Sequence, residues 1–139
     1  MGVSTVGSKR IELSARTATL ALGDGLAILL FVVAGEYSHG IDPFTNVGRV
    51  GGTILPFLVG WGVVAVAGGF YAHRSRASVG RTLAATFAAW VVAVVIAQAL
   101  RATAVFHGDA ALTFALVSVF VGGSVLVGWR VLARFYEQR

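Results

Sequence analysis

The chain consists of four long apolar runs separated by shorter polar segments. The runs cover residues 17–34, 53–71, 81–100 and 110–129. Each approaches the roughly 20 residues that an α-helix needs to cross a bilayer. The segment between the first two runs is rich in Gly, Asp, Asn and Pro, which favour turns. The pattern predicts an all-α integral membrane protein that folds as a four-helix bundle.

The runs also predict how the chain is divided. A cytoplasmic leader covers residues 1–16, a four-transmembrane-helix domain covers 17–132, and a cytoplasmic tail covers 133–139. Pro56 falls in the first turn of the second predicted span, where its missing N–H costs nothing. A basic leader before an apolar run also fits a signal peptide. The length of the first run and its interruption by Asp24 favour a retained helix.

Composition places the chain in the membrane class. Of the 139 residues, 57% are hydrophobic and 12% are charged, whereas soluble domains carry about 25% charged residues. The mean hydropathy is +0.83. Four spans use nearly the whole chain, so we expect the lipid bilayer as its surroundings and the cell membrane as its location. The absence of cysteine excludes disulfides and thiolate metal sites.

The basic residues are distributed unevenly along the chain. A net charge of +5 would suggest a nucleic-acid partner in a soluble protein. Here the basic residues gather at the ends of apolar runs, so no nucleic-acid partner is expected. Only Arg49 and Arg101 fall on one side of the predicted membrane, and the other nine of the 11 fall on the opposite side. Because basic segments stay in the cytoplasm, both termini are predicted to be cytoplasmic.

Asp24 is the most informative polar residue, because it lies near the middle of the first apolar run. A carboxylate there costs roughly 2.5–3.5 kcal/mol on insertion scales. Carboxylates within a membrane usually face the protein interior and often belong to ion or proton pathways. The alternatives are a structural carboxylate bonded to a hydroxyl or backbone group, or a position near the inner headgroups. Asp24 is therefore a candidate transport residue.

Further candidates lie toward the predicted outer side. Arg101 ends the third run, and Gln98 lies one turn before it. At about 1.5 Å per residue, Arg101 lies well outward of Asp24, so a direct pair between them is not expected. Glu36 ends the first run on the same side and is the expected partner of Arg101. The alternative is an interfacial arginine that reaches lipid phosphate.

Histidines do not predict a metal site. His39 and His107 both fall on the predicted outer side, but they lie in different loops without ligand spacing. We therefore keep His39 as a binding candidate only and expect neither a metal nor another cofactor. No set of residues with the spacing of a nucleophile system is present, so an enzyme is not expected.

Small residues recur at helical spacing in the third run, at Ala85, Ala89, Ala93 and Ala97. Such residues let helices approach closely in a membrane, where apolar side chains gain little by leaving lipid. We favour packing within the bundle, and the alternative is a face that meets another subunit of a homo-oligomer.

Several short motifs along the chain resemble those of a known protein family. The motifs are Leu22-Gly23-Asp24, Ser38-His39-Gly40, Pro56-Phe57, Gly60-Trp61, Arg101-Ala102 and Trp129-Arg130. Together they resemble domain-of-unknown-function family 3054, small membrane proteins of archaea and some bacteria. The resemblance implies a membrane protein and no particular activity.

Two functions remain open from the sequence. The first is a small transporter or permeation subunit, a homo-oligomer centred on Asp24, whose substrate is an unspecified ion or small molecule. The second is a non-catalytic scaffold or accessory subunit of a larger membrane complex. A membrane enzyme acting on lipid or quinone lacks a supporting set of residues. The surroundings of Asp24 distinguish the first two: a water-accessible cavity supports transport, and a carboxylate sealed by hydrogen bonds supports a scaffold.

Overall fold

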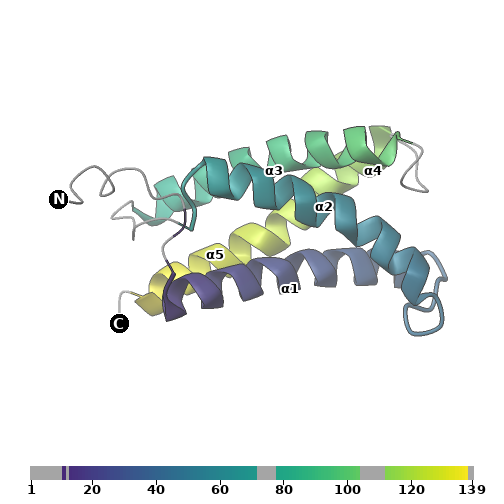
Figure 1. The fold of residues 1–139 in the computed structure, drawn as a ribbon, viewed down its shortest axis with the longest axis horizontal. Helices are drawn as coiled ribbons and strands as arrows, with labels where there is room; N and C mark the ends of the chain where they lie inside the picture. Colours follow the sequence, from purple (N-terminus) through teal and green to yellow (C-terminus); the bar gives the residue numbers. More distant parts are fainter. Residues whose placement is uncertain (1–10, 12, 72–77, 104–111, 138–139) are drawn as a thin grey trace.

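The computed structural model describes residues 11, 13–71, 78–103 and 112–137. Its helices are α1 (Ala15–Ser38), α2 (Val47–Ala67), α3 (Val79–Arg101), α4 (Leu112–Val117), the π-helical turn η2 (Ser118–Gly122) and α5 (Gly123–Glu137). The last three join end to end into one rod (Figure 1). All four rods are long and apolar enough to cross a membrane. The predicted all-α membrane bundle is therefore confirmed.

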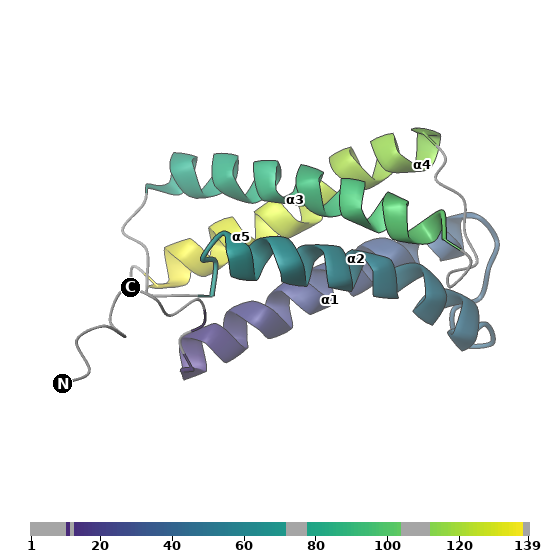
Figure 2. The same cartoon turned by 45° about the horizontal axis from the view of Figure 1, so that its top comes forward.

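The four rods form a closed ring in which each packs against two neighbours. Helix α1 contacts α2 and α5, and α3 contacts the same two helices from the other side (Figure 2). The start of α1, the end of α2, the start of α3 and the end of α5 all meet at one end of the bundle (Figure 1). We call this the α5 end. Ser14 and Ser78 cap helices there, each accepting a hydrogen bond of 3.2 Å from a backbone N–H in the first turn.

Helix α2 begins earlier than the sequence pattern predicted. It starts at Val47 rather than near Thr53, so Pro56 lies inside the helix and not in its first turn. Glycines in this stretch predicted a loop, because glycine favours turns in water. In a bilayer, unpaired backbone groups are costly, and glycine is common within membrane helices. The predicted position of Pro56 was therefore wrong.

The fourth rod ends later than predicted. Helix α5 continues to Glu137, well past the predicted end near residue 129. Arg130 and Arg134 therefore belong to the helix, although the sequence indicated an interfacial end at Trp129-Arg130. Of the two, Arg130 is buried inside the bundle.

Aromatic rings fill the middle of the bundle. Phe57 of α2 lies 5.7 Å from Phe31 of α1, 5.8 Å from Trp90 of α3 and 5.8 Å from Phe114 of α4, measured between ring centroids. These separations suit stacked and edge-to-face aromatic pairs. Phe57 and Trp90 are fully buried, so the rings form a continuous core between all four rods.

The π-helical turn fits around Trp90. The indole Nε1 of Trp90 donates a 2.8 Å hydrogen bond to the carbonyl oxygen of Ser118, the first residue of the turn. A Cβ atom on Gly122 would lie 2.8 Å from Cζ2 of Trp90. The wider turn thus exposes a carbonyl to the indole, and Gly122 leaves the space that the ring occupies.

The small residues of α3 pack within the bundle. Ala89, Ala93 and Ala97 are all buried. On α2, a Cβ atom on Gly60 would lie only 2.5 Å from the carbonyl oxygen of Ala93, so the two backbones are in close contact. These three alanines therefore pack within the bundle, as favoured, whereas Ala85 is exposed. The homo-oligomer stays a prediction.

Candidate functional site

Asp24 lies on the buried face of α1. Its neighbours on this face, Leu20, Ile28 and Phe31, follow the helical spacing of three or four residues. Only 1% of Asp24 is exposed. The helix therefore directs the carboxylate into the bundle, as the sequence led us to expect for a charge within a membrane span.

Arg130 of α5 binds the Asp24 carboxylate at two points. Its Nε lies 2.8 Å from Oδ1 and its Nη2 lies 2.5 Å from Oδ2. Arg130 is itself only 7% exposed. A bidentate arginine–carboxylate pair is among the strongest ionic contacts in proteins. Two buried charges therefore neutralise each other across the α1–α5 interface.

Tyr71 and Trp61 complete the shell around the carboxylate. The Tyr71 hydroxyl donates to Oδ2 of Asp24. Nε1 of Trp61 lies 3.2 Å from the same oxygen and 3.0 Å from the Tyr71 oxygen. We call Asp24, Tyr71, Trp61 and Arg130 the Asp24 cluster. Three side chains donate to the Asp24 carboxylate, so it is sealed rather than open to water.

Aromatic rings also surround the Arg130 guanidinium. Its Cζ lies 5.3 Å from the ring centroid of Phe70, 5.4 Å from that of Tyr71 and 5.8 Å from that of Trp61. A cation within about 6 Å of a ring face is attracted by it. These rings keep Arg130 oriented toward Asp24.

Tyr71 lies beyond the end of α2 and is itself buried. Burial, followed by the negative charge of Asp24 and the hydrogen bond to it, raises the pKa of the Tyr71 phenol well above its ordinary value of 10.0. The phenol therefore stays protonated and remains a hydrogen-bond donor to the carboxylate.

A tight contact beside the cluster sets the approach of α1 and α5. A Cβ atom on Gly23 would lie 1.9 Å from Cε2 of Trp129, so only glycine leaves room for the indole. Asp24 follows Gly23 in α1 and Arg130 follows Trp129 in α5, and these two residues form the ion pair. The Gly23–Trp129 contact therefore holds the two helices at the separation that the pair requires.

The sequence identified Asp24 but not its partners. Asp24 lies about 14 Å along α1 from its first residue, and Arg130 lies about 10 Å before the last residue of α5, at about 1.5 Å per residue. Both helix ends lie at the α5 end of the bundle, so the two charges have similar depth. Matching depths would have suggested the pair, if the end of the fourth helix had been predicted correctly.

The other predicted site residues lie far from Asp24, toward the opposite end of α1 and α3. Glu36 pairs with Arg49 at 3.0 Å and accepts a 3.2 Å hydrogen bond from Thr53. Arg101 instead places its Cζ 4.6 Å from the ring centroid of Phe114. The expected Glu36–Arg101 pair was therefore wrong, because the start of α2 brings Arg49 to Glu36.

Gln98 and His39 do not join the Asp24 cluster. Gln98 is buried, and within the described part of the chain neither its Oε1 nor its Nε2 has a hydrogen-bond partner. His39 is exposed, with Nδ1 2.8 Å from the carbonyl oxygen of Gly35. His107 lies outside the described residues. Among the residues that are described, no group of three or more His, Asp or Glu side chains is placed to hold a metal ion.

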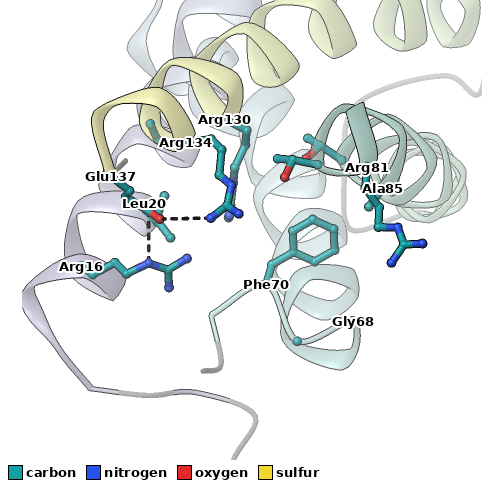
Figure 3. Close-up of a pocket in the computed structure, with 13 residues that line it drawn as sticks. Arg16, Leu20, Gly68, Phe70, Arg81, Ala85, Arg130, Arg134 and Glu137 are labelled. Atoms are coloured by element: carbon teal, nitrogen blue, oxygen red, sulfur yellow. Dashed lines mark hydrogen bonds and ion pairs between the residues drawn. The ribbon is translucent and has the colours of Figure 1, made fainter. Parts of the chain in front are cut away.

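A pocket of about 250 Å³ opens at the α5 end of the bundle. Four arginines line it, together with Glu137; they are Arg16, Arg81, Arg130 and Arg134. Figure 3 shows Arg16 and Glu137 on one side, with Phe70 and Arg81 across from them. Arg130 belongs to both the pocket wall and the Asp24 cluster, whereas Asp24 is not among the lining residues. The pocket therefore ends at the arginine that covers Asp24.

Comparison with known proteins supports the family resemblance seen in the sequence. Residues 21–133 match a family described as "Protein of unknown function (DUF3054)". The matched segment contains all four residues of the Asp24 cluster. No curated protein and no solved structure matches the chain. The resemblance to domain-of-unknown-function family 3054 is thus confirmed.

Proposed function

We propose that this chain, which belongs to the DUF3054 family, is a non-catalytic scaffold or accessory subunit in the membrane. The observation that carries this proposal is the closed environment of Asp24. Its two carboxylate oxygens are occupied by Arg130, Tyr71 and Trp61, and 1% of the residue is exposed. A carboxylate held in this way supports a structural role.

The ion pair suits a protein that must keep one arrangement. Burying two charges costs more than burying apolar groups, so such a pair adds little net stability. Its geometry is specific, however, because any other rotation of α5 would leave Asp24 or Arg130 unpaired. We infer that the pair selects one packing of α1 against α5, which a partner protein would then encounter as a fixed surface.

The core also argues against a path through a single copy. Phe57 and Trp90 are fully buried in the middle of the bundle. A permeating ion or molecule would have to displace both rings. The outward faces carry large apolar side chains instead, such as Leu22, Val95 and Leu132, which are 68%, 64% and 67% exposed. These faces suit lipid or the helices of a partner.

The test compares Asp24→Asn with the wild type in mild detergent. Asn keeps the shape of the side chain but cannot ionise. If the pair is structural, the variant unfolds at a lower temperature because Arg130 loses its counter-charge.

Transport is the second candidate, and the pocket that ends at Arg130 favours it. In a carrier, a ligand in the pocket would compete with Asp24 for the arginine. Asp24 would then exchange protons during the cycle. An Asp24→Asn variant that unfolds at the same temperature as the wild type would replace the scaffold proposal with transport, because the fold would then not need the charge of Asp24.

A further inference from the structure

The pocket at the α5 end gathers more positive charge than its carboxylates neutralise. Arg16 and Arg134 both lie near Glu137, at 3.1 Å and 3.9 Å. Arg130 is paired with Asp24, and Arg81 adds a fourth guanidinium on α3. Among the described residues, one lining carboxylate and Asp24 behind the wall thus face four arginines. The excess charge favours an anion in the pocket.

Two buried hydrogen-bond donors in the wall have no acceptor among the described residues. Thr86 lines the pocket and is fully buried, yet within the described part of the chain its Oγ1 has no hydrogen-bond partner. The same holds for Nη1 of Arg16. Buried polar groups are usually satisfied, because leaving one unpaired is costly. A ligand that accepts hydrogen bonds would satisfy both groups at once.

An apolar groove adjoins this pocket along α1 and α5. Its volume is about 790 Å³, and Leu20, Trp129, Leu132 and Tyr136 lie in its walls. The groove and the pocket share four lining residues, which are Arg16, Leu20, Ala133 and Glu137. A ligand with a charged head and an apolar tail could therefore occupy both spaces.

We propose that the pocket binds a phosphate group, and that the groove beside it accepts an acyl chain of the same anionic phospholipid. Arginine presents a planar fork that matches phosphate oxygens, and the Thr86 hydroxyl supplies a further donor. The pocket lies where the four spans end, which is the depth of the headgroups. Of the six Lys and Arg residues that the structure describes, four lie at this end, as expected for the side that meets anionic lipid.

Native mass spectrometry of the purified full-length chain tests the proposal, with phosphatidylglycerol and phosphatidylcholine as probes. Phosphatidylglycerol is expected to bind more tightly to the wild type. Thr86→Val keeps the side-chain volume but removes the hydroxyl, and it should weaken phosphatidylglycerol binding by about tenfold. Arg81→Gln should weaken it as well. Arg49→Gln makes the same charge change at the opposite end and should have no effect.

The outcomes separate the possible sources of the phosphate group. Equal binding of the two lipids, or an equal loss in Arg49→Gln and Arg81→Gln, would overturn the proposal. A third arm adds inorganic phosphate and follows thermal unfolding. If phosphate alone protects the wild type strongly and Thr86→Val loses this protection, the site holds free phosphate and the lipid assignment fails. None of these results depends on whether Asp24 exchanges protons, so the scaffold proposal is tested separately.

Discussion

Asp24 and Arg130 form a two-point ion pair across the α1–α5 interface, although 106 residues separate them in the sequence. The pair is surrounded by Tyr71, Trp61 and Phe70, so Asp24 has no access to bulk water as a replacement partner, and Arg130 meets water only through the pocket that it lines. The effect of substitutions on stability follows from the burial of the pair. A single substitution leaves one buried charge behind, whereas a double substitution removes both.

The ion pair predicts a non-additive pair of substitutions. Asp24→Asn alone should lower the free energy of unfolding by about 3–5 kcal/mol, because Arg130 remains buried without its counter-charge. The double variant Asp24→Leu with Arg130→Met should recover most of this loss. Glu36→Gln, which touches the exposed Arg49, should cost less than about 1 kcal/mol. Denaturant unfolding in detergent measures all three, and a double variant less stable than Asp24→Asn would contradict the pairing.

Gly23 predicts a steric effect at the same interface. Gly23→Ala should destabilise the protein by about 1–3 kcal/mol, because the new methyl group overlaps the Trp129 indole. Gly25→Ala is the matched control, since nothing lies within 4 Å of the position of its Cβ. The control should be neutral or gain up to about 1 kcal/mol from helix propensity. Equal Tm values for the two variants would show that α1 and α5 are not in this contact.

Gly60 predicts the corresponding effect between α2 and α3. Gly60→Ala would press a methyl group against the backbone of Ala93, which cannot move aside as a flexible side chain can. We expect a lower Tm than for the wild type. Gly62→Ala lies about half a turn from Gly60, on the opposite face of the helix, and has open space around its Cβ, so its Tm should not fall. If Gly62→Ala were the more damaging change, the assigned face of α2 would be wrong.

Tyr71 predicts a loss of stability at high pH. Its folded-state pKa is raised by burial and by Asp24, whereas the unfolded phenol titrates near about pH 10. Below that pH, both states hold the proton and the full contribution of Tyr71 to stability is present. Above it, only the unfolded state releases its proton, so the free energy of unfolding falls as pH rises.

The comparison of wild type with Tyr71→Phe isolates this effect. Below about pH 10 the variant should be less stable by roughly 1.5–3 kcal/mol, because a hydrogen bond to a charged group is lost. Above that pH the difference should shrink. Unfolding midpoints across the alkaline range measure it, and a difference that grows with pH would reverse the assigned direction.

The four helices were predictable because their signal is local. A run of about 20 apolar residues must pair its own backbone groups in lipid, and a helix does so without help from the rest of the chain. Helix ends were predicted less well. The glycines before Pro56 indicated a loop because glycine favours turns, but α2 includes them. Arg130 indicated a helix end because a charged residue favours water, but α5 continues past it.

The candidate site was only half predictable. Asp24 was evident as a charge within an apolar run, and its interior position follows from the cost of placing it in lipid. The cost of placing a charge in lipid did not predict the positions of Gln98 and Glu36. The sequence grouped them as candidates on the outer side, and in the structure both lie far from Asp24. The sequence did not predict Thr86 as a site residue. A threonine within a helix is common, and only the tertiary structure shows that this one lines the pocket.

The sequence by itself determined that the chain folds as four membrane helices with one costly charge in the first. The tertiary structure decided which of the 11 basic residues meets that charge. The choice depends on how far α5 extends and on its rotation about its own axis. The π-helical turn at Ser118–Gly122 and the contact between Gly23 and Trp129 help to set that rotation. The turn and the contact both depend on packing between residues far apart in the sequence, which the hydropathy pattern along the chain does not predict.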